Sequence, residues 1–271
     1  MPPPHGDDEI NHLDKVFRDM TNSITKSRQR EHQFLGMVSH DLRTPLNTVL
    51  ATLNSLSEGV YGKLTPNGEQ RVKQSEAAIE RLTRLAKDLL DLEKLSSGTI
   101  FLPLHPVSLQ EVTRSACEGV SGFSDYKNVV IEVAETNRYV LADQEKLEQV
   151  FINLLSNAIK FSPDGATVNI EFRDLSPIAI EIRVTDTGCG ISLNDQKTIF
   201  EPFTQAEAGV LDNAETQSIR QSGTGLGLAI CKTIIDAHGG TIGLESKPGT
   251  GSVFFIRLRR AEAPVLVSNL Q

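Results

Sequence analysis

The strongest constraint on this chain is a long series of apolar residues that falls on one face of a helix. Between residues 34 and 56 these residues recur mostly at steps of three and four: Phe34, Leu35, Val38, Leu42, Leu46, Val49, Leu53 and Leu56. An amphipathic helix of this length must bury its apolar stripe against another surface. The following stretch, Glu58 to Gly68, contains three glycines and a proline, which predicts a turn.

A second amphipathic helix is predicted after this turn. Its apolar face is formed by Val72, Ile79, Leu82, Ala86, Leu89 and Leu92. A hairpin of two helices leaves much of both stripes uncovered, so we expect two copies of the chain to form a homodimeric four-helix bundle. Ser96, Ser97 and Gly98 predict the end of this hairpin, which we place at residues 31–97.

Residues 1–30 are predicted to form a solvated leader and a further helix. Alternating steps of three and four, typical of a coiled-coil seam, separate Ile10, Leu13, Phe17, Met20 and Ile24. No apolar run approaches the roughly 20 residues that span a bilayer, and no signal peptide is evident, so we expect a cytoplasmic polypeptide. The net charge of −8 argues against nucleic acid as a partner, because phosphate backbones favour clustered Lys and Arg.

Residues 98–260 change to short β-rich runs that alternate with helices, and 271 residues suit two modest domains. Strands are predicted at residues 129–133, 138–141, 168–172, 178–185, 241–246 and 252–258. Helices are predicted at residues 143–160, with Asp143 as the N-cap, and at residues 224–238. The expected class is α+β, with one mixed or antiparallel sheet covered by helices. A loop is predicted at residues 205–222, and the tail at residues 261–271 has no assigned role.

The first chemical motif, Ser39-His40-Asp41-Leu42-Arg43-Thr44-Pro45, lies in the first hairpin helix. His40 and Thr44 are one helical turn apart, with Asp41 beside them. A carboxylate beside an imidazole can orient the ring and accept its proton, which suits a nucleophilic histidine. The alternative is an exposed helical histidine with a solvated acidic neighbour.

Three further motifs follow in order along the chain. Asn153, Asn157 and Lys160 or Phe161 share one helical face, where amide oxygens can bind Mg²⁺ and Lys160 can neutralise phosphate. Residues 186–190, with the sequence DTGCG, come directly after an apolar strand, and residues 223–228, with the sequence GTGLGL, open a helix. Glycines let backbone approach a ligand, and a helix N-terminus attracts phosphate. Local capping, an ordinary turn and a flexible hinge remain the alternatives for these motifs.

The order and spacing of these motifs identify a family. Over nearly all of residues 8–260 the chain resembles the sensor histidine kinases of two-component systems. By this resemblance His40 is the phosphoacceptor, and the second domain has the Bergerat ATP-binding fold, an α/β sandwich. The resemblance also assigns the asparagine box to residues 153–161, the glycine boxes to residues 186–190 and 223–227, the phenylalanine box to Phe200 and Phe203, and the ATP lid to residues 204–222.

The resemblance implies a set of roles for single residues. ATP and Mg²⁺ are the expected cofactors, with Asp186 at the adenine and Asn157 at the metal, where Asn153 is a further candidate ligand. Asp41 is the expected general base, and Thr44 is expected to position water in a phosphatase reaction. The residues expected around the nucleotide are Asn153, Asn157, Lys160, Phe161, Asp186, Gly188, Gly190, Phe200, Phe203, Gly223, Thr224, Gly225, Leu226, Gly227 and Leu228.

Partners and location are also implied by the resemblance. The phosphoryl group is expected to pass to an aspartate of a separate response regulator, because this chain has no receiver-like segment. Residues 8–20 resemble the end of a HAMP signalling domain, except for Asn11, where the family usually has glycine. HAMP domains usually follow a transmembrane helix, so we expect the full-length protein to be anchored in the bacterial inner membrane.

Two rival functions are less well supported. Bergerat-fold ATPases such as gyrase place a glutamate one helical turn before the metal-binding asparagine, and here that position holds Asn153. An amide is a poor base, so water attack on ATP should be slow. The other rival is a coiled-coil scaffold with a degenerate nucleotide domain, and the retention of every box argues against it.

Overall fold

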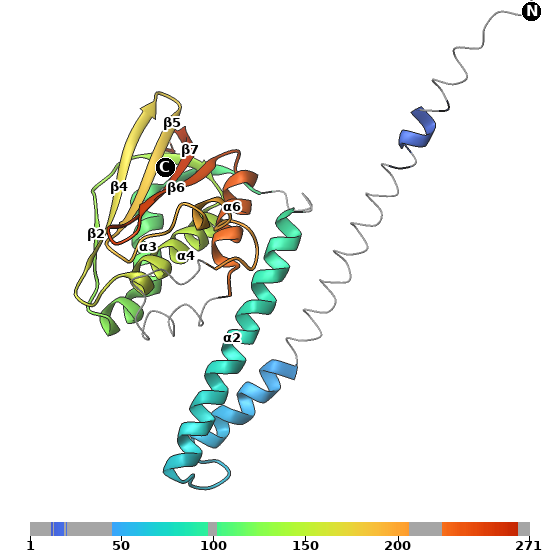
Figure 1. Cartoon of the computed structure of the whole chain (residues 1–271), viewed down its shortest axis with the longest axis vertical. Helices are drawn as coiled ribbons and strands as arrows, with labels where there is room; N and C mark the ends of the chain where they lie inside the picture. The colour runs from blue at the N-terminus through green and yellow to red at the C-terminus, as the bar shows by residue number, and fades with distance from the viewer. Residues whose placement is uncertain are drawn as a thin grey trace, which may run out of the picture. The chain divides into compact units, whose positions relative to one another are not determined.

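The computed structural model describes residues 12, 14–18, 20, 45–96, 102–205 and 224–264. The chain divides into two compact units, Met1–Thr99 and Ile100–Gln271 (Figure 1). In the N-terminal unit, residues 12, 14–18 and 20 are helical and exposed in the single chain. Phe17 and Met20 of the predicted seam are among them, whereas Ile10, Leu13 and Ile24 lie outside the described residues.

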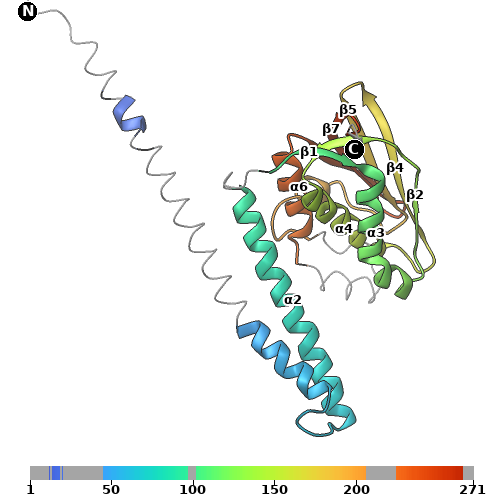
Figure 2. The ribbon, with the colours of Figure 1, turned by 180° about the vertical axis from the view of Figure 1, so that it is seen from behind.

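The predicted helical hairpin is confirmed over its described part. Residues 45–57 form one helix, and α2 (Pro66–Ser96) runs back beside it, as Figures 1 and 2 show. Ser57 Oγ donates a hydrogen bond of 2.7 Å to Glu76 Oε1 between the two helices. Leu46, Val72 and Leu92 are buried, so the apolar stripe packs within the hairpin at both of its ends.

The turn between these helices is shorter than the predicted stretch of residues 58–68. Helix α2 begins at Pro66, because proline at the first helical position needs no N–H partner and already has a helical φ. Thr65 Oγ1 accepts a hydrogen bond of 3.2 Å from the Gly68 amide and caps the first turn. Gly59 and Gly62 have φ angles of +76° and +111°, which end the first helix and reverse the chain.

The second unit contains a seven-stranded mixed sheet, of which six strands and the mixed or antiparallel class were predicted from the sequence. The strands are β1 (His105–Ser108), β2 (Val130–Val133), β3 (Tyr139–Ala142), β4 (Thr167–Ser176), β5 (Ala179–Asp186), β6 (Thr241–Lys247) and β7 (Gly251–Ala261). Their order is β1-β3-β7-β5-β4-β2, and β6 pairs with β7 off this path. Strands β2 and β4 are parallel and the other pairs are antiparallel.

Three helices cover one face of this sheet, as the two ribbon views show (Figures 1 and 2). They are α3 (Leu109–Tyr126), α4 (Gln144–Phe161) and α6 (Gly227–Ala237), and a short 3₁₀ helix is formed by Asp195–Lys197. Every second strand residue faces these helices. The fully buried core side chains include Phe151, Leu154, Leu155, Ile170, Ile180, Ile182, Ile230, Ile234 and Ile256.

Several predicted boundaries of strands and helices were wrong. Strand β4 continues through Asp174 to Ser176, beyond its predicted end at residue 172. It pairs there with β5, and Asp174 binds Arg138 at 2.8 Å. Helix α6 begins at Gly227, three residues later than predicted. Strand β7 extends through Ala261, the first residue of the predicted tail, because it pairs there with Tyr139 of β3.

Strand β1 and helix α3 were not predicted individually. Ser108 is the N-cap of α3, where its side chain accepts a hydrogen bond of 3.3 Å from the Glu111 amide. Of the predicted loop at residues 205–222, only Gln205 is described.

The sheet face opposite the helices carries an ionic ladder around Glu181. Arg257 Nε and Arg183 Nη1 lie 2.8 and 3.1 Å from its two carboxylate oxygens, and Arg183 also binds Glu245 at 2.6 Å. Burial favours the neutral form of Glu181, but the hydrogen bonds from Arg257 and Arg183 outweigh burial and lower the pKa of this carboxyl. These pairs join β5, β6 and β7, so they fix the strand that ends in Asp186.

The helical hairpin is predicted to dimerise, because part of its apolar stripe stays exposed. Val49 and Leu82 expose 44% and 45% of their surface in the single chain. Leu82→Glu should shift a dimer to monomers, since burying an unpaired carboxylate costs several kcal/mol. Analytical ultracentrifugation at micromolar concentration measures this shift. Gln74→Glu, which adds the same charge at an exposed polar position of α2, is the control, and a wild-type monomer would contradict the prediction.

Candidate functional site

Asp186 lies at the end of central strand β5 and is buried. Its Oδ1 accepts two backbone hydrogen bonds, from the Gly188 amide at 2.8 Å and from the Ser252 amide at 3.2 Å. No described residue donates a hydrogen bond to Oδ2. The strand end and the loop after it therefore present one oxygen of a fixed carboxylate to a ligand.

Burial raises the pKa of Asp186 from its ordinary value near 3.8 to about 6, and the amides of Gly188 and Ser252 offset part of this rise. At neutral pH the group is therefore a carboxylate with little water around it. Such an oxygen is a strong acceptor for a ligand N–H group, because the weak solvation leaves the charge unscreened.

The glycines after Asp186 are required by close backbone contacts. A Cβ atom on Gly188 would lie 2.7 Å from the Phe161 carbonyl oxygen and 2.9 Å from Asp186 Oδ1. Gly190 has a φ of +70°, and a Cβ atom there would collide with the Lys247 carbonyl oxygen. The predicted first glycine motif is thus packed directly against the end of the predicted asparagine motif.

Helix α4 carries that asparagine motif. Asp143 is its N-cap, as predicted, and accepts a hydrogen bond of 3.0 Å from the Lys146 amide. Its apolar face is fully buried, whereas Asn153, Asn157 and Lys160 are half-buried on the remaining surface. This burial pattern agrees with the sequence prediction that these polar residues share one helical face.

Helix α6 begins beside Asn153, whose Nδ2 donates a hydrogen bond of 3.4 Å to the Gly227 carbonyl oxygen. Before the helix, Thr224 Oγ1 accepts from the Leu226 amide at 3.2 Å, and Leu226 is fully buried. Among the residues that the structure describes, no side chain caps the N-terminus of α6. Its first amides are therefore available to an anion, and the half-buried Leu228 lies in this same turn.

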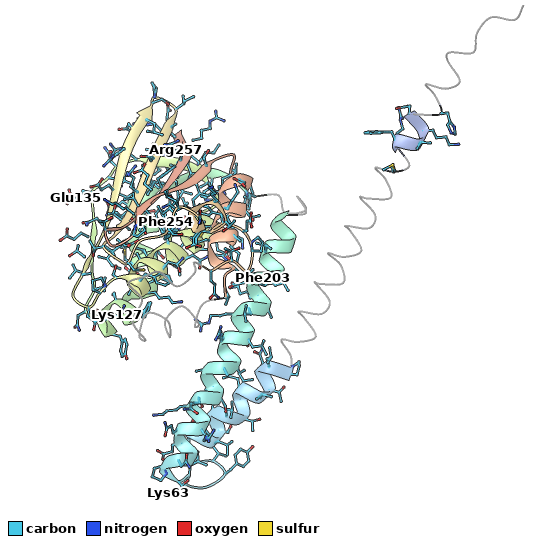
Figure 3. All side chains as sticks on the ribbon, in the orientation of Figure 1. Lys63, Lys127, Glu135, Phe203, Phe254 and Arg257 are labelled. Carbon is cyan, nitrogen blue, oxygen red and sulfur yellow. The ribbon has the colours of Figure 1, made fainter. Side chains whose placement is uncertain are left out.

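The predicted phenylalanine motif divides into two roles. Phe200 packs edge-on against Phe254, with ring centroids 6.5 Å apart, and so anchors the segment in the core. Phe203, labelled in Figure 3 with Phe254, is 65% exposed and has a φ of +62°. A Cβ atom on Gly225 would lie 2.8 Å from the Phe203 carbonyl carbon, so the phenylalanine motif is in contact with the second glycine motif.

His238 is a buried residue that connects the two helices of the candidate site, and no sequence motif indicated this role. Its buried imidazole bonds to the Ile234 carbonyl oxygen through Nδ1 at 2.7 Å and accepts from the Asp143 amide through Nε2 at 2.9 Å. It therefore joins the end of α6 to the beginning of α4, the two helices of the candidate site. Its sequence signal is weak, since a histidine at the end of a helix also fits a simple cap.

His40, Asp41, Thr44 and Gly223 lie outside the described residues. Among the described residues, no cluster of three or more His, Cys, Asp or Glu side chains could hold a metal. The chemistry of the donors still fits Mg²⁺, because this ion binds amide oxygens and commonly completes its shell with water and substrate phosphates. Asn157 and Asn153 are the half-buried amides of α4 that would supply such oxygens.

Comparison with known proteins gives two family matches. The family described as "Histidine kinase-, DNA gyrase B-, and HSP90-like ATPase" matches residues 142–262. The "His Kinase A (phospho-acceptor) domain" family matches residues 30–98. No helix in the described part of the chain is long and apolar enough to cross a membrane.

Individual relatives agree with these matches. "Sensor histidine kinase TmoS" of Ectopseudomonas mendocina is 35% identical over 88% of this chain and 24% of its own length. "Circadian input-output histidine kinase CikA" of Synechococcus elongatus is 34% identical over 83% of this chain and 29% of its own length. The chain thus spans less than a third of the length of these curated relatives.

Solved structures support the same fold. The full-length ShkA structure in complex with AMPPNP has a TM-score of 0.69 and 29% identity, over 85% of this chain and 46% of that one. The histidine kinase AdeS of Acinetobacter baumannii has a TM-score of 0.58 and 26% identity, over 82% of this chain and 98% of that one. With both domains matched in order, the chain belongs to the sensor histidine kinases of two-component systems and comprises their phosphoacceptor and ATP-binding regions.

Proposed function

We propose that this chain transfers the γ-phosphoryl group of Mg-ATP to its own His40 and then to an aspartate of a separate response regulator. The observation that carries the proposal is the convergence of three features in one unit. They are the buried carboxylate of Asp186, the half-buried asparagine face of α4 and the uncapped N-terminus of α6. A nucleotide presents a group for each: an amino group, metal-bound phosphates and anionic oxygens.

Each feature has a defined task in nucleotide binding. Asp186 Oδ2 accepts the adenine amino N–H, while Oδ1 stays bonded to the Gly188 and Ser252 amides. Lys160 and the amides near Gly225 and Gly227 neutralise phosphate oxygens. Mg²⁺, when bound through the asparagine amides, offsets the charge that develops during phosphoryl transfer.

The acceptor chemistry belongs to His40 and its neighbours. A neutral imidazole nitrogen attacks the γ-phosphorus in line with the leaving oxygen, and Asp41 orients the ring and accepts its proton. Pro45 removes the amide that would bond back to residue 41, so the helix can bend at this point. Hydrolysis is disfavoured, because Asn153, which stands at the position of the water-activating base, is an amide bonded to Gly227.

The proposed partners and location follow from the family. A homodimer, through the hairpin, and a response regulator are the partners, and nucleic acid is not. The HAMP-like pattern of residues 8–20 supports attachment of the full-length protein to the bacterial inner membrane through a preceding segment. In agreement with such a signalling helix, the described residues 12, 14–18 and 20 are helical.

Autophosphorylation of His40 is the central prediction. Incubation with γ-labelled Mg-ATP should give a phosphoryl group that is labile in acid and stable in base, because a phosphoramidate hydrolyses when its nitrogen is protonated. The label is quantified after denaturation at high and low pH. His40→Gln should abolish it, and equal labelling of wild type and His40→Gln would refute the proposal.

Asp186→Asn should stabilise the nucleotide-free protein and weaken ATP binding. The folded pKa of about 6 lies above the ordinary value, so the folded state binds the proton more tightly than the unfolded state. The free energy of unfolding contributed by this group is therefore lost as pH rises from about 4 to about 6. At pH 7.5 the Asp186→Asn protein should therefore have a free energy of unfolding about 1–3 kcal/mol higher than the wild type. A change of one pKa unit corresponds to about 1.36 kcal/mol.

The same substitution should have the opposite effect on ATP binding, which it should weaken. ATP affinity should fall about 10- to 100-fold in Asp186→Asn, since a hydrogen bond to a charged group contributes about 1.5–3 kcal/mol. Denaturant unfolding and calorimetric titration measure the two effects. Asp164→Asn, at an exposed carboxylate, is the matched control. An Asp186→Asn variant that binds ATP like the wild type would overturn the adenine assignment.

Thr44 and Asp41 are expected to serve opposed reactions. Thr44→Ala should keep most autophosphorylation and lose dephosphorylation of the regulator by about 10²–10³-fold, the usual effect of removing a positioning group. Asp41→Asn should chiefly slow autophosphorylation. Autophosphorylation is measured with γ-labelled Mg-ATP, and dephosphorylation is measured with a phosphorylated receiver domain. The alternative is a threonine bonded back to the His40 carbonyl, and a parallel loss of both activities in Thr44→Ala would favour it.

A further inference from the structure

Lys127 makes an unusual set of contacts at the end of helix α4 (labelled in Figure 3). Its Nζ donates hydrogen bonds to three backbone carbonyl oxygens, those of Ile159 at 3.2 Å, Lys160 at 3.0 Å and Ser162 at 2.8 Å. Its own carbonyl oxygen accepts from the Gly165 amide at 3.3 Å. Lys127 is also the C-cap residue of α3, so it holds the ends of two helices together.

These contacts satisfy the groups that a helix end leaves open. The last carbonyls of an α-helix have no partner inside the helix and carry the negative end of its dipole. An ammonium group has three donors, and here three carbonyls of the final turn engage it. Hydrogen bonds with an ionised donor are roughly twice as strong as neutral ones, so this turn is firmly fixed.

The same turn lies between Lys127 and the Asp186 loop. The Phe161 carbonyl oxygen is packed so closely on Gly188 that a Cβ atom there would lie 2.7 Å away. The Gly188 amide in turn donates to Asp186 Oδ1. Lys160 belongs to this turn, and Asn157 precedes it directly on α4. A shift of the turn would therefore move both phosphate-facing side chains relative to the adenine acceptor.

We infer that Lys127 is a positioning residue of the nucleotide site, which holds Asn157 and Lys160 in register with the metal-bound phosphates. The inference rests on the proposed Mg-ATP function of that site. Lys127 does not act as a phosphate ligand, because its three donors point to the carbonyls of Ile159, Lys160 and Ser162. Its effect reaches the ligand through the orientation of α4.

The test compares ATP affinity in Mg²⁺ with ATP affinity in EDTA, measured by calorimetric titration on the whole chain. Lys127→Met keeps the aliphatic stem and removes the ammonium. The gain in affinity that Mg²⁺ confers should fall about 10- to 100-fold, the usual effect of losing a residue that orients a metal ligand. Affinity in EDTA, which depends mainly on Asp186, should stay near the wild-type value.

Two further variants make the result decisive. Lys127→Gln is neutral but retains two N–H donors for the carbonyls, so it should fold and show a smaller loss of the Mg²⁺ gain than Lys127→Met. It decides the question alone if Lys127→Met does not fold. Lys232→Met removes an ammonium from an exposed pair with Asp236 and should leave the gain unchanged.

An independent readout needs no nucleotide. Hydrogen exchange of the Ser162 amide, which donates to the Ala158 carbonyl, should be faster in Lys127→Met than in wild type and Lys232→Met. Variants that unfold at lower temperature but keep the wild-type Mg²⁺ gain would show that Lys127 only stabilises the fold, and would overturn the inference. A wild-type protein that binds ATP equally with Mg²⁺ and with EDTA would instead overturn the proposed metal site itself.

Discussion

A buried carboxylate at the end of the central strand sets the conditions for the rest of the second unit. Asp186 is unfavourable for folding as a charge, since burial raises its pKa to about 6. It is tolerated because the Gly188 and Ser252 amides both bind Oδ1. Those amides come from the following loop and from β7, so the loop, the neighbouring strand and the acceptor must be arranged together. The close approach of β7 to Asp186 also requires glycine at position 251, because a Cβ atom there would collide with the Asp186 carbonyl oxygen.

Helix α4 is held at both ends by side chains from other elements. At its beginning, His238 of the α6 terminus accepts from the Asp143 amide, and at its end Lys127 binds the last carbonyls. Both contacts satisfy backbone groups that a helix leaves unpaired. The asparagine face between them thus lies on a rigid helix, which is the arrangement that precise ligand geometry requires.

Local chemistry explains which features could be predicted from sequence. The Asp143 cap, the shared face of Asn153 and Asn157, and the strands β6 and β7 depend on neighbours a few residues away, and the structure agrees with each. The roles of Lys127 and His238 depend on partners 35 and 95 residues distant. A lysine or histidine at the end of a helix does not indicate from the sequence which distant residue it will contact. The length of β4 was missed for the same reason, since Arg138 and Asp174 are 36 residues apart.

The bond between Asn153 and Gly227 connects the fold to the choice of reaction. A hydrolase of this architecture needs a base one turn before the metal-binding asparagine, and a carboxylate there would face the carbonyl of Gly227 at close range. Two acceptors without a shared hydrogen repel each other, whereas the Asn153 amide donates a hydrogen bond to this carbonyl. The same substitution therefore closes the contact between α4 and α6 and removes the group that would activate water. The proposed acceptor of the phosphoryl group is therefore the histidine of the helical hairpin, and we expect hydrolysis of ATP to be slow.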